Sequence, residues 1–209
     1  KQLFGVIGID LPAGPSEVLV IANKNSNPTW IAYDVLAQGE HDPNAKTYVL
    51  SKSKNILIKV KNELKRIMEE TKFKNVDQSI KNNCNLILAK SQKEIYEISN
   101  FIAPEHLHIH EKFNKNLLKN IKNAGSVFLG EKSPVALGDY TIGTNHVLPT
   151  DQTAKFSSGL GVDDYTKKTV FIDPRKKTLK KIANHTINLA RQEGLEAHAL
   201  SVEIRKIKS

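Results

Sequence analysis

The sequence has one cysteine, one methionine and one tryptophan among its 209 residues, and it has no long apolar run. The single thiol, Cys84, excludes an internal disulfide and is typical of a reducing compartment. No segment approaches the roughly 18 apolar residues that a membrane helix needs. The amino terminus also lacks the basic, apolar and small-residue order of a signal peptide. We therefore predict a cytoplasmic protein with Cys84 as a buried or half-buried structural thiol.

Several common functional motifs are absent as well. The sequence contains no G-x-G-x-x-G after a strand, no P-loop, no H-E-x-x-H and no C-x-x-C. This excludes a standard dinucleotide or phosphate cradle built from this chain. Ser16 lies in GPSE rather than in the G-x-S-x-G of a nucleophile elbow, so we do not expect it to be a nucleophile.

The charge balance is basic, with 31 Lys and Arg against 22 Asp and Glu and a formal charge of +9. A nucleic-acid module is one interpretation of such a surplus. The lysines are scattered, however, and are not interleaved with aromatic residues. The densest cluster, Arg175–Lys177 with Lys180 and Lys181, lies at a predicted helix start. We therefore expect a solvated lysine surface and no nucleic-acid partner.

The composition is that of a globular chain, with 39% hydrophobic and 25% charged residues. A chain of this length has room for one large or two small domains. It opens on the apolar segment Leu3–Ile9 without a methionine, which we interpret as a piece of a longer protein.

Short apolar runs alternate with helical periodicity along most of the chain. The predicted strands are Ser16–Ala22, Thr47–Leu50, Asn85–Ala89 and Gly125–Leu129, with His108 and His110 alternating along a further strand. The predicted helices run from Asn27-Pro28 to Asp42-Pro43, over Ile56–Ile67, from Ser91 to about Ile102, and over Phe113–Ile121. This alternation predicts an α/β fold with a parallel sheet and helices packed on it.

The last part of the chain has a different pattern. From Thr178 the periodicity is helical, Gly194 interrupts it, and Glu196–Lys206 is helical again. We place a boundary near Asp173-Pro174, which divides the chain into an α/β catalytic body, 1–173, and a helical tail, 174–209.

Polar groups suited to metal or substrate contact gather in a few segments. Gln38 and His41 are three apart on a predicted helix, where a surface pair is the simpler interpretation and a metal pair the alternative. Glu105 and His106 follow Pro104 at a helix-to-strand junction, where an adjacent acid and imidazole suit two proton transfers. His108 and His110 are interpreted as structural or exposed.

Two further segments carry candidate ligands. Asp139 to Thr150 is too polar for a strand and too rich in glycine for a helix, so we expect a functional loop. In it Asp139 is a candidate metal ligand, His146 a candidate substrate contact, and Asn145 a residue that fixes the turn. Glu193 and His198 bracket Gly194, and a helix-surface position is the simpler interpretation of His198.

Five segments in this order resemble the histidinol dehydrogenase family. They are GPSE at 14–17, QGEHDP at 38–43, APEHL at 103–107, GDYTIGTNHVLPT at 138–150 and GLEAHALSVEIR at 194–205. The resemblance covers the whole chain and corresponds to about the carboxyl-terminal half of a family member. Gly39 stands where the family usually has Ala, and Ala103 where it often has Gly.

The resemblance implies two NAD-dependent oxidations of L-histidinol to L-histidine through a bound aldehyde, with zinc as substrate anchor. It also implies an incomplete Rossmann-like sheet and a homodimer whose tail reaches the partner's site. NAD contacts would lie mostly in the half that is absent. The catalytic pair would be His106 as base and Glu105 as activator of water. The implied zinc ligands are Gln38, His41, Asp139 and His198. The implied substrate contacts are these four with Ser16, His106, His146 and Glu193.

Other functions remain open at this point. One is a non-catalytic fragment that binds zinc or histidinol but lacks the NAD-binding half. Another is a zinc hydrolase in which Glu105 activates water, although a set of four protein ligands leaves a metal less open than three ligands with a bound water.

Overall fold

The computed structural model describes residues 5–9, 11–12, 14–73, 75–110 and 115–207. The chain forms two compact units, Lys1–Tyr165 and Thr166–Ser209. The boundary predicted near Asp173-Pro174 lies inside the second unit, in the irregular segment before its first helix. No helix among the described residues is long and apolar enough to cross a membrane.

The first unit is built on a sheet of five parallel strands in the order β3-β2-β1-β4-β5. This confirms the predicted α/β class with a parallel sheet. The strands are β1 (Glu17–Ala22), β2 (Lys46–Ser51), β3 (Cys84–Leu88), β4 (His106–Ile109) and β5 (Ser126–Leu129). The strand order reverses its direction between β1 and β4, where the register pairs Val18 with His106 and Val20 with His108.

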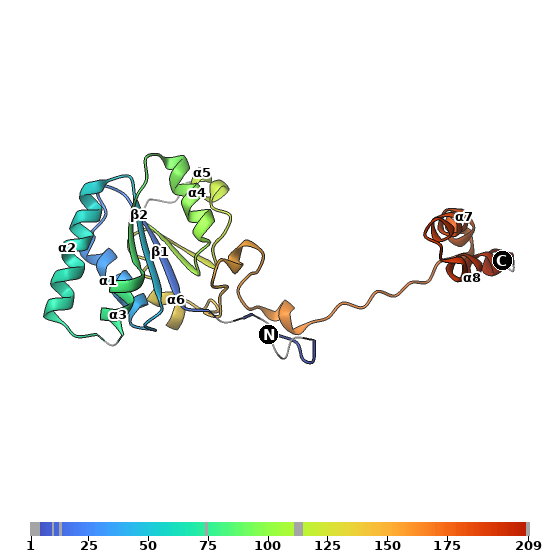
Figure 1. Cartoon of the computed structure of the whole chain (residues 1–209), viewed down its shortest axis with the longest axis horizontal. Coiled ribbons are helices and arrows are strands. Elements are labelled where there is room, and N and C mark those ends of the chain that lie inside the picture. Colours follow the sequence, from blue (N-terminus) through green and yellow to red (C-terminus); the bar gives the residue numbers. More distant parts are fainter. Residues whose placement is uncertain (1–4, 10, 13, 74, 111–114, 208–209) are drawn as a thin grey trace. The chain divides into compact units, whose positions relative to one another are not determined.

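Helices cover both faces of the sheet, as Figure 1 shows. The side chains of β1 alternate between two cores, because successive residues of a strand point to opposite faces. Val18 and Val20 pack with α1 (Pro28–Gly39), α2 (Lys54–Glu70) and α3 (Val76–Asn83). Leu19 and Ile21 pack on the other face, with α4 (Gln92–Ile102) and α5 (Lys115–Asn120).

The helix starts follow from the capping residues that the sequence offers. The side chain of Asn27 accepts hydrogen bonds from the backbone N–H groups of Thr29 and Trp30, and Pro28 occupies the first helical position. The Ser91 hydroxyl accepts from the Glu94 N–H at 3.1 Å. Both caps satisfy backbone donors that the first turn of a helix leaves free. The helix predicted around Phe113 is α5, although Phe113 itself lies outside the described residues.

Two short helices differ from the sequence prediction. The helix α3 lies in a stretch for which no helix or strand is predicted. The helix α6 (Ala136–Tyr140) carries Gly138 and Asp139, so the start of the stretch predicted to be a loop is helical, whereas residues 141–150 form neither helix nor strand, as predicted. A side chain at position 138 would place its Cβ 2.6 Å from Cζ of Phe128, so glycine permits α6 to pack closely on β5. Two 3₁₀ turns follow, at Thr153–Lys155 and Val162–Tyr165.

The second unit contains two helices, α7 (Lys176–Gln192) and α8 (Glu196–Ile207), and it confirms the helical end of the fold prediction. Gly194 adopts a positive φ of 75°, which ends α7 at little steric cost. A small core joins the helices through Ile187, Ala190 and Ala199. At the surface, Arg191 pairs with Glu196 at 3.1 Å and with Glu203 at 2.8 Å.

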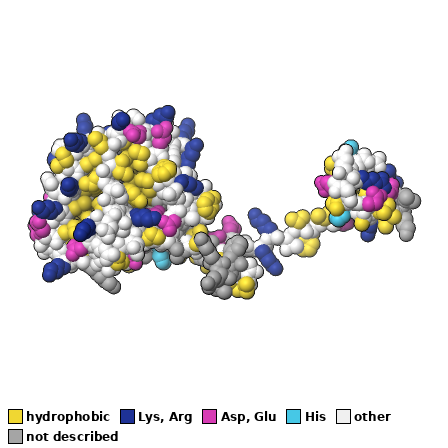
Figure 2. Space-filling view, viewed as in Figure 1, with side chains coloured by type: hydrophobic (Ala, Val, Ile, Leu, Met, Phe, Trp, Pro, Cys, Tyr) yellow, Lys and Arg dark blue, Asp and Glu magenta, His cyan; other side chains and the backbone are white. Residues whose placement is uncertain are grey.

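Apolar groups also reach the surface of the first unit. Figure 2 shows hydrophobic side chains gathered between α2 and α4. The strand β3 forms one edge of the sheet, and its Leu88 is 49% exposed. Cys84, at the start of this strand, is half-buried, and burial raises the pKa of its thiol. The half-buried position agrees with the prediction.

Candidate active site at the amino edge of the sheet

Two parallel strands begin side by side with acidic and imidazole side chains. Glu17 is the first residue of β1 and His106 the first of β4, with Glu105 directly before it. The neighbouring strand β5 begins just after Gly125, where a Cβ would lie 2.6 Å from the Glu105 carbonyl oxygen. Glycine therefore allows β5 to approach the turn that carries Glu105. We call this end of the sheet the amino edge.

Glu105 is buried, with 7% of its surface exposed. Its Oε2 accepts a hydrogen bond from the Glu17 backbone N–H at 2.9 Å. Burial raises the pKa of Glu105 to about 7; the negative charges of Glu17 and Asp139 add to the rise, and the Glu17 N–H opposes it. A carboxyl group with this pKa can both accept and return a proton near neutral pH.

His106 is also buried, and one hydrogen bond fixes its proton. Its Nδ1 lies 3.1 Å from the Glu17 carbonyl oxygen and 3.5 Å from Glu105 Oε2. Since a carbonyl oxygen only accepts, Nδ1 must donate, and the neutral ring then carries its lone pair on Nε2. Burial lowers the pKa of His106, which keeps the ring neutral at pH 7. Nε2 faces Asp139 Oδ1 at 3.8 Å and is free to accept a proton.

A small cavity brings three of the four predicted zinc ligands together. It has a volume of about 50 Å³, and Gln38, His41 and Asp139 are among the residues that line it. This exceeds the roughly 10–15 Å³ that a single water molecule needs. The three side chains offer an amide oxygen, an imidazole nitrogen and a carboxylate, a set of donors that suits zinc. The donor set and the space therefore fit the metal that the resemblance implies.

The local structure corrects two interpretations from the sequence. Gln38 lies in the last turn of α1 with 4% of its surface exposed, so Gln38 and His41 are not a helix-surface pair. His41 is exposed and lies just beyond the helix, which ends at Gly39. Glu105 and His106 lie at the predicted helix-to-strand junction and are buried.

Other predicted site residues lie apart from this cavity or in the second unit. Ser16 lines a neighbouring cavity of about 560 Å³ that also includes His41. His146 is exposed on the loop after α6, where Asn145 fixes the turn through its Oδ1, which accepts from the Val147 N–H at 2.9 Å. Glu193 caps α7 and His198 lies in the first turn of α8, both exposed in the second unit.

An ion-pair network lies next to these residues, and it was not predicted from the sequence. Lys46 Nζ lies 3.3 Å from Glu17 Oε1 and 2.5 Å from Asp151 Oδ1. Glu17 is buried, and burial raises the pKa of its carboxyl group in spite of Lys46. Lys46 thus compensates a buried acid whose backbone holds both Glu105 and His106. The parallel pairing of β1 with β2 sets Glu17 beside Lys46, and no local pattern of the sequence indicates this contact.

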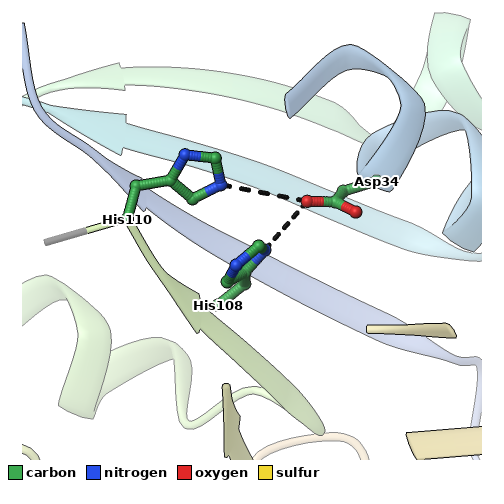
Figure 3. A group of neighbouring side chains, drawn as sticks. All are labelled: Asp34, His108 and His110. Carbon is green, nitrogen blue, oxygen red and sulfur yellow. Dashed lines mark hydrogen bonds and ion pairs between the residues drawn. The ribbon is translucent and has the colours of Figure 1, made fainter. Parts of the chain in front are cut away.

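A second cluster lies farther along the same face of β4. Asp34 of α1 contacts His108 and His110, and their ligand atoms all lie within 4.8 Å of one another. Figure 3 shows both imidazole rings directed at the Asp34 carboxylate. Both histidines are buried, so of the two predicted alternatives, structural or exposed, the exposed one is wrong. Across the described part of the chain, this is the single group of three His, Cys, Asp or Glu side chains with such spacing.

Comparison with known proteins gives one consistent result. A sequence model of the family described as histidinol dehydrogenase matches residues 1–206. A histidinol dehydrogenase of Listeria monocytogenes is 45% identical over 206 residues, which are 98% of this chain and 48% of the relative. That of Aquifex aeolicus is 42% identical over 207 residues, which are 99% of this chain and 49% of the relative.

A solved structure agrees with the sequence relatives. The crystal structure of histidinol dehydrogenase from Elizabethkingia anophelis matches with a TM-score of 0.88 and 36% identity, and it covers 100% of this chain and 48% of the other. The chain therefore spans about half the length of the curated relatives that it matches.

Proposed function

Because the chain belongs to the histidinol dehydrogenase family, we propose that it supplies the catalytic residues for oxidation of L-histidinol to L-histidine through a bound aldehyde. These are the last two steps of histidine biosynthesis. The chain spans about half of its relatives, so the complete enzyme also needs the part that this chain does not match.

Zinc and NAD are the cofactors of this proposal. When bound, zinc would orient the substrate and NAD⁺ would accept the hydride. Gln38, His41 and Asp139 would hold zinc together with His198. Their common cavity supports the first three assignments. No residue of this chain is assigned to NAD.

In the first oxidation, His106 removes the hydroxyl proton of the alcohol at Nε2 while hydride leaves the carbon. The bond from Nδ1–H to the Glu17 carbonyl supports this role, because it directs the lone pair of the neutral ring to Nε2. When the ring becomes an imidazolium, the same carbonyl and the nearby carboxylates of Glu105 and Asp139 stabilise the positive charge. The aldehyde remains bound at the site.

The second oxidation needs a water molecule. Glu105 in its carboxylate form takes one proton from water as the oxygen adds to the aldehyde carbon, and the imidazolium of His106 returns its proton to the aldehyde oxygen, which gives the hydrate. The neutral His106 then takes a hydroxyl proton of the hydrate as hydride leaves the carbon, and a second NAD⁺ would accept that hydride. The resulting carboxylic acid loses its proton to solvent and gives the carboxylate of histidine. A pKa of about 7 suits Glu105 to this exchange.

The remaining assignments concern substrate contacts and assembly. Ser16, His146 and Glu193 would contact the substrate together with the zinc ligands and His106. The enzyme would be a cytoplasmic homodimer in which Glu193 and His198 serve the site of the partner subunit. The compact second unit, which carries both residues on its own pair of helices, is compatible with such an exchange.

One observation carries the proposal: a neutral, buried imidazole with a fixed tautomer lies beside a carboxyl group of pKa about 7 and faces Asp139, which lines the cavity with Gln38 and His41. A zinc hydrolase would also use the Glu105 carboxyl group to activate water, but it would cleave its substrate by hydrolysis and would not need NAD.

The test is the number of NADH formed per L-histidinol. The 209-residue chain should be combined with the part of the Listeria monocytogenes relative that it does not match. We expect two NADH per substrate, loss of the reaction on chelation and recovery with zinc. The unmatched part alone is the control and should give none. A folded, zinc-loaded assembly that forms no NADH would contradict the proposed function.

A further inference from the structure

The carboxyl end of β4 carries a polar cluster that the proposed reaction does not use. Asp34, His108 and His110 come from the middle of α1, from β4 and from the residue directly after it. His108 is fully buried, His110 is 4% exposed, and the Asp34 side chain is 11% exposed. Such a concentration of polar groups in a core costs stability unless every group has a partner.

The hydrogen bonds of His108 leave two acceptors facing one another. Its Nε2 lies 2.9 Å from the Gly130 carbonyl oxygen, which only accepts, so Nε2 carries a proton. In the neutral ring Nδ1 then has a lone pair, and it faces Asp34 Oδ2 at 2.8 Å. A lone pair and a carboxylate oxygen at this distance need a cation between them, either a proton or a metal ion.

His110 gives the second observation. Among the described residues, neither of its ring nitrogens has a hydrogen-bond partner, although both are buried. Its Nε2 lies 3.9 Å from the same oxygen, Asp34 Oδ2, and its Nδ1 lies 3.8 Å from Glu131 Oε1. Buried polar groups without a partner are rare in native structures and often mark an ion or a ligand. The unpartnered Nε2 points at the atom that already needs a cation (Figure 3).

We propose that Asp34, His108 and His110 bind a zinc ion, or a similar borderline divalent metal, through Oδ2, Nδ1 and Nε2. Its ligand set shares no residue with the set proposed for the catalytic zinc, although Asp34 also lines the cavity of Gln38, His41 and Asp139. Two imidazole nitrogens and one carboxylate oxygen form a donor set typical of zinc.

The geometry needs only small shifts to accept the ion. Bonds of 2.0–2.2 Å around a tetrahedral metal place two ligand atoms about 3.3–3.5 Å apart. His108 Nδ1 lies 2.8 Å from Asp34 Oδ2, slightly too close, and His110 Nε2 lies 3.9 Å from it, slightly too far. A shift of about half an ångström at each histidine would therefore bring both distances to Asp34 Oδ2 into the range of a bound metal, and all three ligand atoms already lie within 4.8 Å of one another.

The surroundings also fit a metal site. A ligating histidine usually donates its other ring N–H to a carbonyl or carboxylate, which fixes its orientation. The Gly130 carbonyl fills this role for His108, and Glu131 lies in the direction of the far nitrogen of His110. A cavity of about 310 Å³ lies beside the cluster and is lined by Asp34 and Glu131 among others.

The place in the fold agrees with a ligand site. The strand order reverses between β1 and β4, and open α/β sheets commonly bind ligands at the carboxyl ends of strands at such a switch point. His110 follows β4 at this point, and its backbone N–H donates to the Ile21 carbonyl oxygen of β1 at 2.9 Å. An ion here would connect α1, β4 and the segment after β5.

Metal titration separates this site from the catalytic one. The double variant His41→Asn, Asp139→Asn of the 209-residue chain should be titrated with Zn²⁺ and with Co²⁺, whose visible spectrum reports the ligands. We expect one bound ion per chain. Adding His110→Gln should weaken binding by more than the roughly 10–100-fold that loss of an outer-shell partner costs. Adding His185→Gln, an exposed histidine of α7, should change nothing.

A measurement on the unmutated chain is independent of how the variants fold. Zinc addition should shift the imidazole ¹⁵N resonances of His108 Nδ1 and His110 Nε2, while His185 stays unchanged. Unchanged resonances of His108 and His110 at saturating zinc would overturn the proposal, as would equal affinity with and without His110→Gln. In that case a proton shared between His108 and Asp34 fills the cluster. Neither result bears on histidinol oxidation, so the proposed function stands or fails separately.

Discussion

The face of β4 that meets α1 carries three histidines, and its two ends are built differently. At the amino edge His106 has a hydrogen-bonded Nδ1, a free Nε2 and the acids Glu105 and Asp139 nearby. At the carboxyl end His110 has two buried ring nitrogens without a hydrogen-bond partner among the described residues. The same residue type on one strand face thus suits proton transfer at one end and metal binding at the other, because its neighbours differ.

The location of the two sites is equally instructive. Parallel α/β sheets commonly bind ligands at their carboxyl edge. In this chain Gln38, Glu105, His106 and Asp139 lie at the amino edge instead. The helix α1 contributes to both sites, because Asp34, which contacts His108, and Gln38 are one turn apart on it. The proposed metal site of Asp34, His108 and His110 lies at the carboxyl end of β4.

The largest expected effect is that of His106→Asn on the amino edge. Asparagine can still donate a hydrogen bond to the Glu17 carbonyl but cannot take up the substrate proton. We expect turnover of the assembled enzyme to fall by about 10²–10⁴-fold, the usual contribution of a general base. Steady-state NADH formation measures this, and metal analysis should find zinc unchanged. A near-normal rate would contradict the role of His106 as general base, and with it the assignment of proton transfer to the amino edge of β4.

Glu105→Gln should affect one half of the reaction more than the other. Without the carboxylate, hydration of the aldehyde slows, so the first NADH should form faster than the second in a single turnover. In the unsubstituted enzyme the second step should accelerate as pH rises through about 7, since the deprotonated acid is the active form. The variant should lose this dependence. Equal slowing of both steps would assign Glu105 a structural role.

The stability of Glu105→Gln should depend on pH with a defined sign. The folded state raises the pKa of Glu105 from 4.5 to about 7, so the ionised acid opposes folding above that pH. The variant should therefore gain free energy of unfolding relative to the unsubstituted chain between pH 4.5 and 7, by up to about 3 kcal/mol, and no more above pH 7. Urea titrations at pH 5 and pH 8 measure this. If the difference in free energy of unfolding between the variant and the unsubstituted chain stayed constant with pH, the raised pKa of buried Glu105 would be contradicted.

Lys46→Met should weaken the amino edge alone. Glu17 is buried, and Lys46 is the cation that compensates it, so its loss leaves a buried acid poorly paired. We expect a loss of about 1–3 kcal/mol in the free energy of unfolding at pH 8, because Lys46 itself is partly exposed. The loss should shrink at low pH, where Glu17 becomes protonated. Lys65→Met, on the surface of α2, is the matched control and should change stability little.

The smallest effect is expected for Gly39→Ala next to Gln38. A Cβ there would lie 3.0 Å from Ser79 Oγ and 3.4 Å from Ile80 Cδ1, so side chains of α3 lie close to this position. Alanine favours the helix by about 1 kcal/mol, and the contact with buried Ser79 opposes that gain. The net change in free energy of unfolding should stay below about 1 kcal/mol. Zinc affinity of the Asp34 cluster should not change.

The sheet was predictable because its strands are continuous apolar runs between clear turn residues. Glu17–Ala22 and Lys46–Ser51 agree with the predicted runs within one residue at each end. The helix α3 was missed because its sequence VDQSIKNN has few apolar residues, and it is fixed by packing of Val76 in the core. The helix α6 was missed because Gly138 is unfavourable in a helix by itself and is explained only by the contact with Phe128.

The candidate site was predictable to the extent that it lies in short motifs. Glu105 and His106 were singled out because they are adjacent after Pro104. The roles of Glu17 and Lys46 were not, since these depend on which strands lie next to one another. His108 and His110 were assigned no role because nothing local in the sequence places Asp34 against them. That contact spans 74 residues between Asp34 and His108 and exists only in the folded sheet.

The most direct test of the two-site account is a crystal of the 209-residue chain soaked in zinc, with anomalous scattering measured at the zinc edge. The account predicts one peak between Asp34, His108 and His110, and a second peak beside Gln38, His41 and Asp139. A single peak at the second position would contradict the metal site at the carboxyl end of β4. A single peak at the first position would contradict the proposed catalytic zinc ligands.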